Sequence, residues 1–418
     1  MTTTAVLTTS DYLGTLAATR CLGRHGVRVV VAASGVLGPA QWSRSASRVV
    51  RCPKPVDPDV TLAWLLDFGA RDPGAVLHPT SDEMAWLISR HANRLRDVFR
   101  LYAPPFDAIR TLLDKARLDR ACVAVGLDRP ETFFPRDENE AAELASRGGA
   151  FVVKPRTQVF YTSHMKGDIV SGRENVAYAW RACRSWRHAP SVRVDAPDID
   201  KPLVQAFVPA AREGVYSIAG FVTRDHQVLA ARASRKILQR PAGVGVGVCF
   251  EGAPVDATLV TKLAALAKHV GFFGAFEAEF VGCGEHKLID FNPRYYGQMG
   301  FDIARGAPLP WMLHLGALGH EDLLRNEASD AILAGAPRVY EDFMTLRLML
   351  ASRRLAGTLP AERQAKWKLW REAHGADAMD ATLAPDDPLP AVASAVSTLW
   401  GAARHPRGFW RSLLRGTL

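Results

Sequence analysis

Residues 287–300 read KLIDFNPRYYGQMG, an apolar run with polar residues at every second position: Asp290, Asn292 and Arg294. Alternate side chains of a β-strand point to the same face of its sheet. The spacing therefore predicts a strand that presents an acid, an amide and a cation together on one face. Pro293 then ends regular pairing, because proline has no backbone N–H to donate to a neighbouring strand.

The residues before this run predict its partner strand. Residues 275–294, AFEAEFVGCGEHKLIDFNPR, are typical of a β-hairpin with a glycine-containing turn. Glu277 and Glu279 share a face of the first strand, so an acid from that strand can lie beside Asp290. Two carboxylates and an amide oxygen form the hard oxygen site that Mg²⁺ prefers. Two questions stay open here. Either Glu277 or Glu279 can be the ligand, and a strand whose polar face points to water would have the same pattern.

Three basic segments upstream can supply cations for a phosphate. Lys154 closes the apolar strand FVVKP, and Lys115 lies in a predicted helix. Residues 234–252, SRKILQRPAGVGVGVCFEG, join Arg235 and Lys236 to a glycine-rich loop that can approach a phosphate closely. The alternative for all three segments is a set of solvated surface cations, and each segment alone leaves that alternative open.

The periodicity of the chain indicates several structural units. The chain of 418 residues is longer than a single domain with one hydrophobic core usually is. Residues 1–105 alternate buried strands with helices, which predicts an α/β domain with a parallel sheet. Residues 106–325 mix helices with antiparallel strands, and residues 326–418 have helical spacing.

Two local patterns within these units are specific enough to test. Residues 108–126, AIRTLLDKARLDRACVAVG, have the spacing of one continuous amphipathic helix. Thr80 and Glu83 have the spacing of a capping box at the start of another helix.

Composition limits the classes of function. The chain carries 52 Lys and Arg against 43 Asp and Glu, a net charge of +9. Such a balance fits an anionic partner, and with no recognised nucleic-acid motif a nucleotide is favoured over DNA or RNA. The six cysteines include no C-x-x-C pair, which predicts free thiols and a cytoplasmic location. We expect no signal peptide and no membrane span, because no run of about 18 apolar residues occurs.

Six segments occur in an order that resembles the ATP-grasp superfamily, and more narrowly its stand-alone ATP-dependent carboxylate–amine ligases, which join amino acids or peptides. These are DKARL (114–118), VVKP (152–155), LVQAFVP (203–209), REGVYSIAG (212–220), FEAEF (276–280) and LIDFNPR (288–294). The resemblance covers about residues 1–325. It implies an α/β protein with a pre-ATP-grasp domain (1–105) and an ATP-grasp domain (106–325), split into a small lobe (106–205) and a large lobe (206–325). A helical C-terminal region (326–418) lies outside it.

The resemblance also implies roles for particular residues. Lys115 and Lys154 match lysines that reach the ATP phosphates. The segment LVQAFVP matches the hinge between the two lobes, whose residues contact the adenine. Glu213 matches the acid near the ribose. The implied nucleotide contacts are therefore Gln205, Ala206, Phe207, Val208 and Glu213. The residues that match the ligands of one or two Mg²⁺, with Mn²⁺ as a substitute, are Glu279, Asp290 and Asn292. The residues that match cations facing the transferred phosphoryl group or the substrate are Arg294, Lys236 and Arg235.

The sequence departs from the family pattern at three places. Ala206 stands where many members carry Glu, and Asp290 stands where Glu is usual. The loop after Lys154 lacks the usual dense glycines, and it offers Ser163 and Lys166 instead. We therefore expect one adenine contact to be missing and the phosphate-covering loop to differ.

The implied reaction is the ATP-dependent formation of an amide from a small carboxylate and an amine, through an acyl phosphate. Transfer to a non-amine acceptor, and nucleotide binding without catalysis, are the alternatives. The residues after the metal motif either choose the substrate or pack behind the site: Tyr295, Tyr296, Gln298 and Met299. The C-terminal helices pack on their own chain or on a second copy in a homodimer, or else they bind a membrane surface or another partner.

Overall fold

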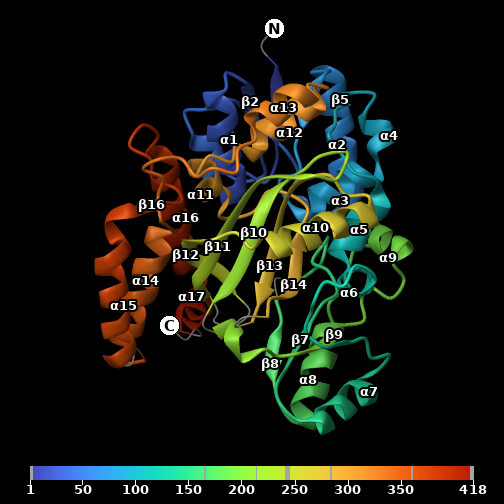
Figure 1. The fold of residues 1–418 in the computed structure, drawn as a ribbon, viewed down its shortest axis with the longest axis vertical. Helices are drawn as coiled ribbons and strands as arrows, with labels where there is room; N and C mark the ends of the chain where they lie inside the picture. The colour runs from blue at the N-terminus through green and yellow to red at the C-terminus, as the bar shows by residue number, and fades with distance from the viewer. Residues whose placement is uncertain are drawn as a thin grey trace.

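The structure is a computed structural model that describes residues 3–163, 166–212, 214–240, 245–282, 285–358 and 361–414. Three β-sheets with covering helices make up this part of the chain (Figure 1). The predicted α/β class is therefore confirmed, whereas the predicted domain limits stay a prediction. No helix in these ranges is both long enough and apolar enough to cross a membrane.

The N-terminal sheet has five parallel strands in the order β3-β2-β1-β4-β5. Its strands are β1 (Thr4–Leu7), β2 (Arg28–Ala33), β3 (Ala46–Arg51), β4 (Ala75–Leu77) and β5 (Phe99–Arg100). Its helices are α1 (Leu13–Arg24), α2 (Pro58–Arg71), α3 (Asp82–Arg90) and α4 (Ala92–Leu95). The strand order reverses between β1 and β4, and in such sheets a ligand crevice opens beyond the carboxyl ends of the strands at that point.

The small sheet has four antiparallel strands in the order β6-β9-β7-β8 and lies at the bottom of Figure 1. Its strands are β6 (Thr132–Phe133), β7 (Phe151–Lys154), β8 (Asp168–Val170) and β9 (Leu203–Ala206). The accompanying helices are α7 (Glu138–Glu143), α8 (Arg173–Arg184) and α9 (Pro190–Asp195). Val153 of β7 and Trp180 of α8 belong to a small hydrophobic core of its own.

The large sheet has seven strands in the order β14-β13-β10-β11-β12-β15-β16. They are β10 (Val215–Val222), β11 (Val228–Arg240), β12 (Val246–Ala253), β13 (Gly274–Val281), β14 (Lys287–Asn292), β15 (Val339–Glu341) and β16 (Ala378–Asp380). Its pairs are antiparallel except the parallel pair β15–β16. Helices α10 (Ala257–Val270), α11 (Met299–Ala304), α12 (Leu309–Ala317) and α13 (Glu321–Glu327) complete this region.

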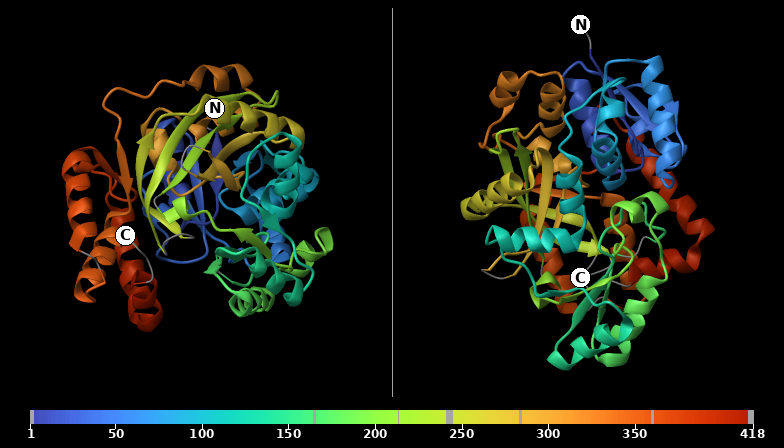
Figure 2. Two further views of the ribbon diagram at one scale, coloured as in Figure 1. Left: turned by 60° about the horizontal axis from the view of Figure 1, so that its bottom comes forward. Right: turned by 90° about the vertical axis from the view of Figure 1, so that its right-hand side faces the viewer.

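The C-terminal region extends the large sheet as well as forming helices. Its helices are α14 (Phe343–Leu355), α15 (Ala361–His374), α16 (Leu389–Arg404) and α17 (Pro406–Leu414). The strands β15 and β16 were not expected, because three residues each are too few to show a periodic pattern. The left view of Figure 2 shows the C-terminal helices on one side of the large sheet and the helices of residues 106–124 on the other.

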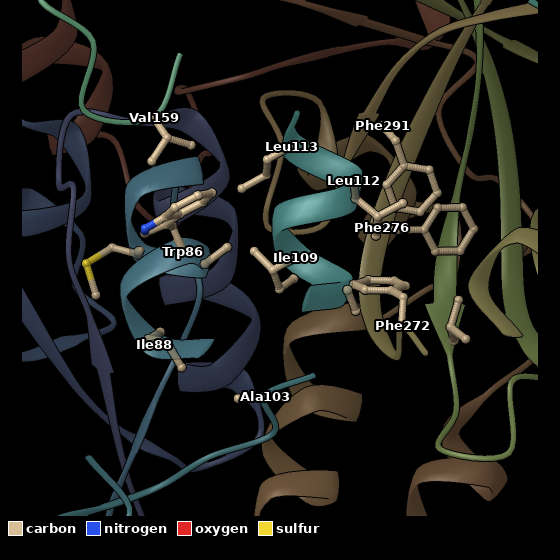
Figure 3. Packing of buried hydrophobic residues seen from close by; sticks show 14 of the residues in the cluster. Trp86, Ile88, Ala103, Ile109, Leu112, Leu113, Val159, Phe272, Phe276 and Phe291 are labelled. Atoms are coloured by element: carbon tan, nitrogen blue, oxygen red, sulfur yellow. The ribbon is translucent and has the colours of Figure 1, made fainter. Parts of the chain in front are cut away.

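The helix α5 (Phe106–Leu113) joins the N-terminal sheet to the large sheet through one shared hydrophobic core. Figure 3 shows α5 between Trp86 of α3 on one side and the phenylalanines of β13 and β14 on the other. Trp86 meets Phe106 edge to face at 4.8 Å, and Phe276 stacks on Phe291 at 5.5 Å. Such aromatic contacts add specific packing to the area that they bury.

Two local predictions were wrong for identifiable reasons. The single helix predicted for residues 108–126 is two helices, because Asp114 adopts an extended conformation and caps α6 (Lys115–Ala124) by accepting a hydrogen bond from the amide of Ala116. The cap of α3 is Ser81, which accepts from the amide of Met84. Thr80 does not cap the helix, since its hydroxyl bonds instead to Thr8 at 2.7 Å.

Candidate active site

A cavity of about 370 Å³ lies where the three sheets meet. The predicted site residues among those that line it are Lys115, Lys154, Gln205, Ala206, Phe207, Val208, Lys236, Glu279, Asp290, Asn292 and Arg294. The turn after β1 contributes Tyr12 to the wall, and the first residue of α3 contributes Asp82. Residues of the small sheet and the large sheet, and the segments that follow strands of the N-terminal sheet, thus line one space.

The strands β13 and β14 supply the acidic part of the wall. Glu279 pairs directly with Asp290, and Glu277 pairs directly with Asn292. Residues that face each other on neighbouring strands have side chains on the same face of the sheet. This register, which the sequence left open, places all four polar side chains together.

Lysines from different elements pair with two of these acids. Lys115, the first residue of α6, has its Nζ 2.8 Å from Oδ1 of Asp290. Lys236 of β11 has its Nζ 2.6 Å from Oε1 of Glu279. Each carboxylate therefore has its own cation, which offsets the repulsion between two facing acids.

Lys154 differs from the other two lysines because no carboxylate among the described residues forms an ion pair with it. Its Nζ donates to Oε1 of Gln205 at 3.0 Å, and its side chain is buried at the end of β7. Burial, together with the nearby charge of Lys115, lowers the pKa of Lys154 to about 8. For Asp290, burial alone would raise the pKa, but Lys115 and Lys154 outweigh it and lower the pKa to about 2. The cavity thus holds an ionised acid beside a lysine that is short of counter-charge.

Glu277 has a different environment from Glu279. The amide of Asn292 donates to Oε2 of Glu277 at 2.8 Å, and the amide of Gln298 donates to its other oxygen. Burial and the charge of Glu279 raise the pKa of Glu277 to about 7. Both oxygens of Glu277 are therefore used in holding neighbouring amides, whereas Glu279 faces Asp290.

The donor atoms in this wall fit Mg²⁺. Glu279, Asp290 and Asn292 offer oxygens from two adjacent strands, and no imidazole or thiol stands among them. Within the described ranges, no group of three or more His, Cys, Asp and Glu side chains is placed to hold a metal ion by itself. Magnesium sites that use one or two carboxylates complete their shell with water and phosphate oxygens, which suits this set.

Arg294 follows the strand β14 and points to the N-terminal sheet. Its Nε donates to Oδ1 of Asp82 at 2.7 Å, and its Nη2 donates to Oδ1 of Asn292 at 2.7 Å. Tyr12 lies under the guanidinium, with its ring centre 5.7 Å away. Sequence reasoning did not identify Asp82 as a site residue.

The structure separates the predicted pair of Arg235 and Lys236. Lys236 lines the cavity, but Arg235 is exposed and does not line it, because successive residues of a strand point to opposite faces. Glu213, the residue predicted near the ribose, lies outside the described residues.

The hinge that follows β9 lines the cavity, but much of its backbone is already bonded. The amide of Ala206 donates to the carbonyl of Glu131 at 2.8 Å, and that of Phe207 donates to the carbonyl of Ala150 at 2.9 Å. Within the described ranges, the amide of Val208 makes no backbone hydrogen bond. Val208 is therefore the hinge residue best placed to donate to a ligand.

The residues after the metal motif divide between the two interpretations. Tyr296 and Gln298 line the cavity, whereas Tyr295 and Met299 are buried away from it. The Tyr295 hydroxyl lies 2.6 Å from Nδ1 of His78. The C-terminal region adds Tyr340 of β15 to the cavity wall, a contribution that no sequence pattern indicated.

Comparison with known proteins finds similarity in structure only. Neither a protein-family model nor a curated protein sequence matches the chain. Among solved structures, the biotin carboxylase domain of Hydrogenobacter thermophilus 2-oxoglutarate carboxylase superposes with a TM-score of 0.59 at 14% identity, over 75% of this chain and 69% of that one. That domain is a dimer, solved with MgADP, ADP and bicarbonate.

Two other enzymes superpose over more of their own length. N5-carboxyaminoimidazole synthetase from Staphylococcus aureus has a TM-score of 0.56 at 11% identity, over 80% of each chain. An L-amino acid ligase from Bacillus licheniformis has a TM-score of 0.55 at 13% identity, over 76% of this chain and 74% of that one. These proteins are ATP-grasp enzymes, and identities this low establish the shared architecture alone. The chain has the ATP-grasp fold.

Proposed function

We propose that the chain is an ATP-dependent ligase that joins a small carboxylate to an amine through an acyl phosphate, releasing ADP and phosphate. The observation that carries this proposal is the facing pair of Glu279 and Asp290, with Lys115, Lys236 and Lys154 directed at the same cavity. The fold of an L-amino acid ligase, which this chain shares, supports the proposal.

In this proposal the nucleotide lies between the small sheet and the large sheet. Adenine takes the hinge at Val208, and the phosphates take Lys154 and Lys115. Glu279, Asp290 and Asn292 would hold Mg²⁺, which would supply positive charge to the triphosphate. Lys236 and Lys115 balance the charge of the two acids while the site holds no nucleotide. Once the metal ion and the nucleotide bind, the two lysines can contact phosphate oxygens instead.

The proposed chemistry takes two steps. A carboxylate oxygen of the substrate attacks the γ-phosphorus, forming a new P–O bond as the bond to the leaving ADP breaks. The amine nitrogen then attacks the acyl carbon, phosphate leaves with the electron pair of the C–O bond, and the nitrogen loses a proton to solvent or phosphate. The chain contributes position and charge, chiefly through Lys154, and no side chain has to act as a nucleophile.

The proposed setting is the cytoplasm, where ATP is available and thiols stay reduced. The described cysteines are free, and four of them are buried: Cys21, Cys122, Cys183 and Cys249. A homodimer is an additional proposal, supported by the dimeric biotin carboxylase domain of the same fold.

The proposal is tested by measuring ADP release from Mg·ATP with a panel of carboxylates, each with and without amines, and by identifying products by mass. We expect ADP formation that requires a carboxylate, and a hydroxamate when hydroxylamine replaces the amine. Carboxylate-dependent ADP without a hydroxamate would favour transfer to another acceptor. Tight ATP binding without ADP release on any pair would favour a non-catalytic nucleotide-binding protein and contradict the ligase.

A further inference from the structure

The guanidinium of Arg294 has all its hydrogen-bond donors engaged by the protein. An arginine side chain carries five N–H groups. Its acceptors are Asp82 Oδ1 for Nε at 2.7 Å, Tyr12 Oη at 3.2 Å and the Tyr295 carbonyl at 2.9 Å for Nη1, and Asp82 Oδ2 at 3.4 Å and Asn292 Oδ1 at 2.7 Å for Nη2. Each N–H group therefore has an acceptor on the protein.

The burial of Arg294 makes this arrangement hard to exchange. The residue is 8% exposed, and the two oxygens of Asp82 bind Nε and Nη2 along one edge of the guanidinium. A buried guanidinium that loses its carboxylate partner bears the full cost of desolvation. The geometry therefore favours a permanent contact between the start of α3 and the end of β14.

Arg294 in turn fixes the orientation of Asn292. The Asn292 oxygen accepts from Arg294, and the Asn292 nitrogen donates to Glu277 at 2.8 Å. The two contacts determine which end of the amide carries the oxygen. An amide turned by half a rotation would present N–H groups where a metal ion requires an oxygen.

We propose that Asp82 and Arg294 are a positioning pair that sets the Asn292 oxygen for the metal ion. This inference rests on the proposed function of the same site. It makes the N-terminal sheet, through Asp82, part of the apparatus that holds the metal. The rival explanation is that Asp82 occupies the place of a substrate carboxylate, which displaces it on binding.

The first test is the affinity of Mn²⁺ in the presence of a non-hydrolysable ATP analogue, followed by electron paramagnetic resonance. Loss of a group that orients a metal ligand typically weakens metal affinity about 10- to 100-fold. We expect that loss for Asp82→Ala and Asp82→Asn, the latter keeping the size of the side chain. The control is Asp59→Asn, because Asp59 is exposed in the first turn of α2 and forms no ion pair in the described structure. Wild-type affinity in both Asp82 variants would overturn the proposal.

A double variant tests whether Asp82 acts through Asn292. If it does, adding Asp82→Asn to Asn292→Ala should not weaken Mn²⁺ binding further, because the positioned oxygen is already absent. Additive losses would contradict the positioning role.

Turnover separates positioning from the rival explanation. Positioning predicts that Asp82→Asn lowers kcat and leaves the KM for the carboxylate unchanged, whereas a displaced Asp82 predicts a lower KM. The lower KM would overturn the proposal. A wild-type chain that binds no Mn²⁺ with the nucleotide analogue would contradict the proposed function itself, which is a different result from normal binding by both wild type and variants.

Discussion

Glu279 of β13 lies directly opposite Asp290 of β14, and a different lysine holds each carboxylate. Two facing acids in a buried wall would each favour protonation of the other. Lys236 and Lys115 prevent this, since they supply one positive charge to each acid. A divalent cation held by these acids would take over that role, and the lysines would then be available to the phosphates of the proposed nucleotide.

The substitution Asp290→Asn tests this arrangement. We expect Mn²⁺ affinity with a bound ATP analogue to fall by at least the roughly 10- to 100-fold that outer partners of a metal ligand cost. Circular dichroism should be unchanged, because the amide keeps the shape of the side chain. The control is Asp225→Asn, which removes an exposed aspartate paired with Arg325. Unchanged metal affinity and ADP release would contradict the assignment of Asp290.

The low pKa of Lys154 predicts a pH-dependent affinity for ATP. Burial and Lys115 lower that pKa to about 8, so Lys154 is protonated below this pH and loses its charge above it. ATP affinity should therefore fall as pH rises from 7 to 9. The variant Lys154→Gln should bind ATP weakly at every pH, with no fall over the same interval, as calorimetry can measure. An equal pH dependence in both proteins would show that another group titrates.

Much of the candidate site is encoded locally. Alternation in KLIDFN predicts which side chains of β14 share a face, and the same period in FEAEF predicts its partner. The pairing of Glu279 with Asp290 was the further step, because register depends on the turn between the strands. Alternation also explains the one residue placed elsewhere, since Arg235 and Lys236 are adjacent and cannot share a face.

The rest depends on contacts between distant residues. Asp82 and Arg294 are separated by 212 positions, and nothing at the start of α3 identifies the partner of Asp82. The break at Asp114 was hidden because a capping aspartate and a solvent-facing aspartate look alike within a helical pattern. Tyr340 reaches the cavity from β15, a strand of only three residues. The pairing of β15 with β12 determines this strand more than the β-propensity of its own residues does.

A glycine of α1 tests how closely the N-terminal sheet region packs on the segment after β14. A Cβ at Gly14 would lie 2.7 Å from the carbonyl oxygen of Tyr296, so Gly14→Ala should destabilise the protein by about 1–3 kcal/mol. Gly401 of α16 has open space around it, and Gly401→Ala should stabilise by about 0.5–1 kcal/mol. Urea unfolding measures both. Equal effects in the two variants would mean that helix propensity, and not contact with Tyr296, decides the result.

Asp387 links the C-terminal region to the N-terminal sheet region through hydrogen bonds and an ion pair. Its Oδ2 accepts from Nε of Arg20 at 2.9 Å and from the Ser43 hydroxyl at 2.6 Å, and its Oδ1 accepts from the amide of Arg44 at 2.9 Å. Asp387→Ala would leave the buried Arg20 without its carboxylate. We expect a loss of about 3–5 kcal/mol in the free energy of unfolding at pH 7. The exposed neighbour provides the control, since Asp386→Ala should change stability little.

The same variant has a predicted dependence on pH. Burial alone would raise the pKa of Asp387, but its hydrogen bonds from Ser43 and Arg44 and its ion pair with Arg20 lower it below the usual value. A carboxyl group whose pKa is lowered in the folded state stabilises above its unfolded pKa, about 3.9, and loses that contribution as pH falls through the folded pKa. The difference in the free energy of unfolding between wild type and Asp387→Ala, measured with urea, should therefore have its full value at pH 6 and decrease below about pH 4. A difference that stayed constant down to pH 3 would mean that packing, and not the charge of Asp387, holds the two regions together.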